Sequence, residues 1–123
     1  FLVRSLNHEL TSDEMLEIAQ KELKGIATAT HSYSSESLLE ISAIGVSKGE
    51  TLAKLAQRLN ISAADVITFG DNPNDISMLE WSGRSYAMAT AHPAAQAAAK
   101  SIAPECNDDG VAQVLEKLLI ADA

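Results

Sequence analysis

Residues 66–75 read Val-Ile-Thr-Phe-Gly-Asp-Asn-Pro-Asn-Asp. The first four are β-branched or aromatic and do not alternate with charged residues, which is typical of a strand buried on both faces of a parallel sheet. The polar residues after Gly70 can begin a helix, with Asn72 as its N-cap and Pro73 at its first position. This stretch therefore predicts a strand, a short loop and a helix, the repeating unit of α/β folds.

The sequence on either side continues this alternation. Upstream, Ser47 and Glu50 have the spacing of a capping box, and apolar residues follow at helical spacing as far as Leu59. The elements expected downstream are a strand over 86–89, a helix over 93–100, a strand over 101–103 and a last helix from residue 111. Strict alternation with short connections predicts a parallel sheet covered by helices.

The first 43 residues have a different pattern. Thr11 and Glu14 form a second capping-box pattern, which predicts a helix that ends near Lys24. The strands expected in this part are 1–4, 26–33 and 38–41. Because this pattern changes at Ala43, we predict two domains, residues 1–43 and residues 44–123.

Composition excludes several classes of protein. The chain of 123 residues has 17 acidic and 9 basic side chains, a formal charge of -8, which argues against a general nucleic-acid binder. No apolar stretch approaches the roughly 20 residues of a membrane-spanning helix. Cys106 is the only cysteine, so no internal disulfide can form, and we expect a cytoplasmic protein. The chain begins at Phe1 within a predicted strand, so we expect a truncated or processed product.

Three polar residues follow the strand of residues 66–69 closely. Asp71 lies directly after it, and Asn74 and Asp75 lie in the first turn of the next helix. Ligands in doubly wound sheets bind beyond the carboxyl ends of the strands, and Mg²⁺ prefers oxygen ligands of these types. A magnesium site is one interpretation, and a capped turn without a ligand is the other.

Lys48 is the second candidate. A lysine in the first turn of a helix opposes the helix dipole, so it either contacts a bound anion such as phosphate or remains a solvated surface residue. The three histidines His8, His31 and His92 are scattered and have no metal-ligand spacing, which favours ordinary structural or surface roles for them.

Two segments together resemble a known family. Gly45-Val46-Ser47-Lys48-Gly49 and the segment from Phe69 to Leu79 are similar to the Cof-type branch of the haloacid dehalogenase-like hydrolases. The resemblance implies an α/β fold, a partial Rossmann-like core whose parallel sheet is flanked by helices. It further implies that residues 1–43 are the closing α-β-β piece of an inserted cap domain.

The resemblance also implies a role for each candidate residue. Lys48 matches the lysine that steadies the nucleophile and the transferring phosphoryl group, and Asp71 matches an aspartate that binds Mg²⁺. Asn74 matches the asparagine that contacts the substrate phosphate. Asp75 matches a second acid, expected to orient Lys48 or a metal-bound water.

The activity implied is Mg²⁺-dependent hydrolysis of phosphoric monoesters through an aspartyl-phosphate, with small phosphorylated metabolites such as sugar phosphates as substrates. The family's nucleophile and general acid lie in an Asp-x-Asp motif, and no such pair occurs in this chain. We therefore expect the chain alone to be inactive. We also expect an open sheet edge that favours self-association or a second chain that supplies the missing segment. The alternatives are a non-catalytic module that binds phosphate or Mg²⁺ and a structural interaction domain.

Overall fold

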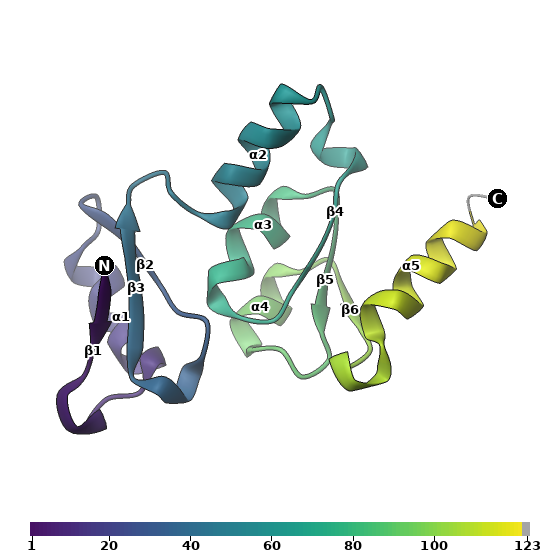
Figure 1. Ribbon diagram of the computed structural model, residues 1–123. Helices are drawn as coiled ribbons and strands as arrows, with labels where there is room; N and C mark the ends of the chain where they lie inside the picture. Colours follow the sequence, from purple (N-terminus) through teal and green to yellow (C-terminus); the bar gives the residue numbers. More distant parts are fainter. Residues whose placement is uncertain (122–123) are drawn as a thin grey trace.

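The computed structural model describes residues 1–121 and contains two three-stranded sheets (Figure 1). The first sheet is antiparallel and belongs to the N-terminal part of the chain. The second is parallel and belongs to the C-terminal part. The chain passes from the first sheet to the second between Ala43 and Lys48. The predicted change of architecture is therefore present, while the division into two domains, residues 1–43 and 44–123, stays a prediction.

The N-terminal part places one helix on one face of its sheet. Its elements are β1 (Leu2–Arg4), α1 (Ser12–Glu22), β2 (Ala27–Thr30) and β3 (Leu38–Ala43), with the strand order β1-β3-β2. In the register of β2 and β3, Thr28 lies opposite Ser42 and Thr30 lies opposite Glu40. Because side chains alternate along a strand, these four share one face, and the buried Leu39 lies on the other.

The start of α1 follows the prediction. The Thr11 hydroxyl accepts the amide of Glu14 at 3.2 Å, and the Glu14 carboxylate accepts the amide of Thr11 at 2.9 Å, so the capping box is confirmed. The strand predicted over 26–33 is shorter, because the chain leaves the sheet after Thr30. The carbonyl of His31, the next residue, accepts the amide of Asn74 in the other part of the molecule.

The C-terminal part has the predicted alternation. Its elements are α2 (Lys48–Arg58), β4 (Ile67–Gly70), α3 (Ile76–Trp81), β5 (Arg84–Met88), α4 (Pro93–Ala98), β6 (Ser101–Ala103) and α5 (Gly110–Ala121). The strands are parallel in the order β4-β5-β6, which confirms the α/β class. A short 3-10 turn, Pro73–Asp75, precedes α3, and Asn72 caps it as predicted.

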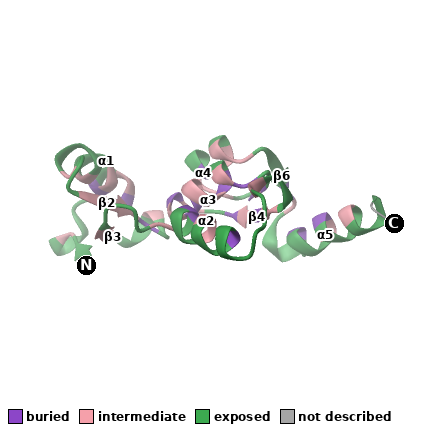
Figure 2. Cartoon of the chain, turned by 90° about the horizontal axis from the view of Figure 1, so that it is seen from above, coloured by how far each residue is buried: buried purple, intermediate pink, exposed green. Residues whose placement is uncertain are grey.

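The C-terminal part has two groups of buried residues. Leu79, Ala87 and Ala95 are fully buried where α3 and α4 cover the sheet. Met88, Ala103 and Val114 form a second cluster beneath the start of α5. Figure 2 shows that the rest of α5 is mostly exposed. Among residues 1–121, no strand pairs with the outer edge of β4, and no helix is both long and apolar enough to cross a membrane.

Candidate functional site

Asp75 lies at the centre of the predicted site. It is only 3% exposed, and one carboxylate oxygen accepts a hydrogen bond from the Lys48 ammonium. The other oxygen accepts the amides of Asp71 at 2.9 Å and Asn72 at 3.2 Å. Burial acts to raise the pKa of Asp75, but the bonds from Lys48 and from the two amides outweigh burial and lower that pKa. Asp75 is therefore a carboxylate that fixes both the lysine and the loop.

Two glycines allow these groups to approach. A Cβ atom on Gly70 would lie 2.5 Å from the Cβ of Asp75, so only glycine leaves room for that side chain beside β4. A Cβ atom on Gly49 would lie 2.4 Å from the carbonyl oxygen of Ser77, where the first turn of α2 meets α3. The Ser77 hydroxyl accepts the amide of Gly49 at 3.0 Å. The close packing of α2 on α3 is what brings Lys48 to Asp75.

Lys48 is the first residue of α2. Ser47 caps the helix by accepting the amide of Glu50 at 3.1 Å, so this half of the predicted capping box is present. The side chain of Lys48 is half-exposed although its ammonium is paired with Asp75. The ammonium therefore has a fixed position and remains accessible from the solvent side, which suits contact with an anion.

Asp71 precedes the turn that Asp75 closes, and Asn74 lies within that turn. Asp71 is exposed at the end of β4, and Asn74 is half-buried. Within residues 1–121 neither side chain makes a hydrogen bond, so a carboxylate and an amide oxygen are available in the same loop. This donor set fits Mg²⁺, which takes one or two carboxylates and fills its remaining positions with water and phosphate oxygens. Both oxygens of Asp75 are already engaged, which favours its orienting role.

Two cavities flank this loop. Lys48 and Asn74 line one of about 560 Å³ between the first sheet and α2. The residues on its sheet side are Thr28, Thr30, Glu40 and Ser42, but most of the surface that lines this cavity is apolar. Asp71 lines the other, of about 540 Å³, together with Asp13 and His92. The structure thus brings all four predicted residues to one loop and helix start, although Asp71 and Lys48 line different cavities.

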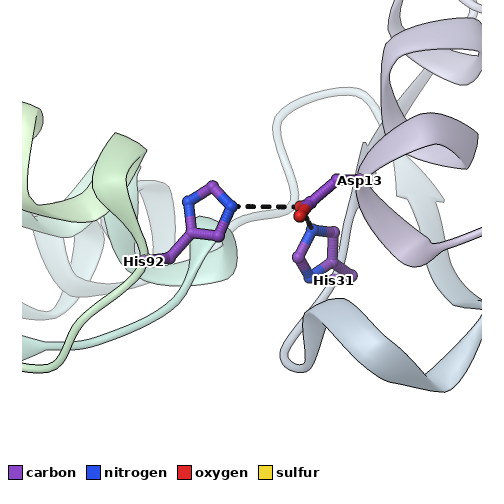
Figure 3. Close-up of side chains that lie close together, drawn as sticks. All are labelled: Asp13, His31 and His92. Carbon is purple, nitrogen blue, oxygen red and sulfur yellow. Dashed lines mark hydrogen bonds and ion pairs between the residues drawn. The ribbon is translucent and has the colours of Figure 1, made fainter.

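A second polar cluster was missed by the sequence analysis (Figure 3). One oxygen of Asp13 lies 2.7 Å from Nε2 of His31 and 3.1 Å from Nε2 of His92. The scattered positions of the histidines in the sequence had not indicated that two of the three share one carboxylate. Asp13 and His92 are 79 residues apart, and they meet because the first turn of α1 lies beside the residue that caps α4. Burial acts to raise the pKa of Asp13, but the bond from His31 and the attraction of both histidines outweigh burial and lower that pKa.

Comparison with known proteins gives consistent matches. A family model for haloacid dehalogenase-like hydrolases matches residues 2–115. The 5-amino-6-(5-phospho-D-ribitylamino)uracil phosphatase YbjI of Escherichia coli (strain K12) is 35% identical over 116 residues, which cover 91% of this chain and 42% of that protein. Phosphatase YwpJ of Bacillus subtilis (strain 168) is 34% identical over 106 residues, 86% of this chain and 37% of that protein.

A solved structure of a haloacid dehalogenase-like hydrolase from B. subtilis has the same arrangement. It matches with a TM-score of 0.77 and 31% identity, over 94% of this chain and 39% of that one. The chain thus spans about two fifths of the length of each of these three proteins.

Proposed function

The chain belongs to the haloacid dehalogenase-like hydrolases, in their Cof-type branch, and we propose that the whole protein is a Mg²⁺-dependent phosphatase of small phosphorylated metabolites. The observation that supports this most is the Lys48 ammonium, which Asp75 holds beside the loop that contains Asp71 and Asn74. A fixed cation next to available oxygen and amide groups is what a phosphoryl group requires.

Each of the four candidate residues has a defined task in the proposed reaction. Lys48 offsets negative charge on the phosphoryl group as it is transferred, and Asp75 keeps the ammonium in place. Asn74 donates its amide N–H to a phosphate oxygen. Asp71 holds Mg²⁺, which when bound neutralises the phosphoryl oxygens. The attacking carboxylate, which forms the aspartyl-phosphate, and the general acid lie outside these 123 residues, since the chain has no Asp-x-Asp pair.

The polar sheet face supports a hydroxylated leaving group. Thr28, Ser42 and Glu40 of this face line the cavity that Lys48 and Asn74 also line, whereas the Thr30 hydroxyl is buried. Such groups can exchange hydrogen bonds with the hydroxyls of a sugar or polyol. The name of YbjI specifies a substrate with its phosphate on a ribityl chain, which has this character. We therefore propose sugar or polyol phosphates as the substrate class.

The test compares two lysines of the same helix in the intact protein. Lys48→Met removes the paired cation, and Lys54→Met removes an exposed one further along α2. We expect kcat for phosphate release to fall by about 100-fold or more in the first variant, as when one charge-stabilising donor is lost. Lys54→Met should retain full activity. Equal activity of Lys48→Met and the natural protein would refute the proposal.

A non-catalytic module that binds phosphate or Mg²⁺ is the second candidate, favoured by the absence of a nucleophile motif from this chain. The isolated chain should not hydrolyse p-nitrophenyl phosphate under either proposal. The intact protein distinguishes them, because Asp71→Asn should abolish Mg²⁺-dependent turnover only if the protein is a phosphatase. A protein that binds Mg²⁺ and phosphate without any turnover would favour the module.

We further propose that the open edge of β4 pairs with another strand, either in a second copy or in a chain that supplies the missing segment. Within the described residues 1–121 the backbone groups of this edge pair with no strand, which supports the proposal, since such edges recruit partners. A purely monomeric chain in sedimentation at micromolar concentration would contradict the first of these two options.

A further inference from the structure

The cluster of Asp13, His31 and His92 joins the two parts of the molecule (Figure 3). Asp13 belongs to the first turn of α1, and His31 directly follows β2. His92 comes from the C-terminal part, where it caps α4. The two rings pack edge to face with their centroids 5.8 Å apart. One carboxylate oxygen thus connects elements of both parts.

The surroundings of the rings determine where their protons lie. Nδ1 of His92 accepts the amide N–H of Ala94 at 3.1 Å, so that nitrogen has no proton and Nε2 must have it. His31 is 1% exposed, and its Nδ1 has no partner among the described residues. A proton on that nitrogen would be buried without an acceptor, which is costly. Both rings therefore donate N–H from Nε2 to Asp13.

The same observations argue against a metal ion between these three residues. A histidine that binds a metal through Nε2 offers its lone pair there and normally donates its Nδ1–H to an acceptor. Nδ1 of His92 faces an N–H donor instead, and Nδ1 of His31 faces no acceptor. Separations of 2.7 and 3.1 Å are those of hydrogen bonds. Hydrogen bonds from the two rings to Asp13, rather than a shared metal ion, therefore account for the arrangement of the three side chains.

Both histidines are also bonded through their main chains to residues of the candidate site. The carbonyl of His31 accepts the amide of Asn74 at 3.2 Å, and the amide of His92 donates to the carbonyl of Asp71 at 2.8 Å. The start of α1, which contains Asp13, is itself bonded to the sheet. The buried hydroxyl of Ser12 accepts the amide of Leu38 in β3 at 3.1 Å. These hydrogen bonds, together with the covalent links within Ser12–Asp13, His31 and His92, therefore connect β3 through Asp13 to the loop.

We infer that Asp13 is a positioning residue, which accepts one N–H from His31 and one from His92 and so holds the N-terminal part against the loop of Asp71 and Asn74. Removing the Asp13 carboxylate leaves both rings without their acceptor. It should thereby weaken the main-chain bonds between Asn74 and His31 and between His92 and Asp71. The significance of this tie for turnover rests on the proposed function. Its geometry does not, so the test uses the 123-residue chain and measures no turnover.

The experiment is NMR spectroscopy of the chain labelled with ¹⁵N. Long-range ¹H–¹⁵N correlations of the natural chain should show Nε2–H on both rings at neutral pH. Asp13→Leu, which has a similar shape but no acceptor, should lower the hydrogen-exchange protection of the Asn74 and His92 amides by about tenfold, the equivalent of one hydrogen bond. Asp13→Asn keeps an acceptor oxygen and should retain protection within about threefold.

The control is Glu17→Leu, which removes an exposed carboxylate one turn along α1 and should change neither signal. Unchanged protection in Asp13→Leu, or equal losses in Asp13→Asn and Asp13→Leu, would overturn the inference. So would equimolar Zn²⁺ moving the proton of both rings to Nδ1. The spectrum of the natural chain decides even if Asp13→Leu does not fold, since Nδ1–H on His92 contradicts the arrangement.

Discussion

Asp75 and Asp13 are both carboxylates that tie separate segments together, but their surroundings differ. The side chain of Asp75 is 5% exposed and binds one ammonium and two main-chain amides within the C-terminal part. The side chain of Asp13 is 45% exposed and binds two imidazoles, one from each part. The first site is built into the packing of α2 on α3, whereas the second joins elements of the two parts. Asp75 should therefore matter for stability, and Asp13 for how the parts are placed.

The largest effect on stability should come from replacing Asp75 by asparagine, and the same replacement at Asp13 provides the comparison. In Asp75→Asn the new side chain must direct its NH2 group at either the ammonium or the two amides, so a buried bond is lost. We expect Asp75→Asn to lower the free energy of unfolding by about 3 kcal/mol, at the low end for breaking a buried pair because Lys48 keeps contact with water. Asp13→Asn keeps an acceptor for both rings and should cost less than about 1 kcal/mol.

Urea unfolding of the chain at pH 7 measures both values. Glu17→Gln, an exposed change on α1, is the matched control and should cost nothing measurable. A larger loss for Asp13→Asn than for Asp75→Asn would reverse the comparison and make the contact between the parts the more important for stability.

A smaller effect is expected from Gly70→Ala. The added Cβ would lie 2.5 Å from the Cβ of Asp75 and would displace that side chain from β4. We expect a loss of about 2 kcal/mol, as for other overpacked interiors. Asp75→Asn should make Gly70→Ala less costly, because the two changes disturb the same contact. A double-mutant cycle in urea measures this coupling, and strict additivity would show that Gly70 acts independently of Asp75.

The smallest effect is the dependence of stability on pH. The pKa of Asp75 is lowered from its usual 3.8, so its contribution to stability is full above that pH and is lost as the pH falls through the lower folded pKa. The stability difference between the natural chain and Asp75→Asn should therefore be constant from pH 7 to about 5 and shrink below about 4. Thermal unfolding across this range measures it. A difference that grows on acidification would mean that the pKa is raised.

The contrast between the two aspartates also shows how far the sequence could lead. The loop of Asp71, Asn74 and Asp75 is contiguous, and Lys48 begins a helix with a recognisable cap, so local patterns were sufficient to predict where these residues lie. The alternation from α2 to α5 was predictable for the same reason, since each element has its own periodicity and end signals. Their functional roles stay predictions.

The cluster around Asp13 had no such signal. His31 follows a strand that ends earlier than its sequence suggests, because its main chain is bonded to Asn74 instead of continuing the sheet. His92 precedes a proline, and its sequence pattern indicates only a helix start. Which two of three scattered histidines would meet one carboxylate depends on how the two parts of the molecule meet, and no local pattern determines that.

The most direct test is a crystal structure of the intact protein with Mn²⁺, which substitutes for Mg²⁺ at oxygen sites and can be located by anomalous scattering, and with phosphate. The proposed function predicts Mn²⁺ on the Asp71 carboxylate. It also predicts a phosphate oxygen within hydrogen-bonding distance of both the Lys48 ammonium and the Asn74 amide. Phosphate bound elsewhere, or Lys48 and Asp71 directed to opposite faces of the molecule with the metal on neither, would contradict it.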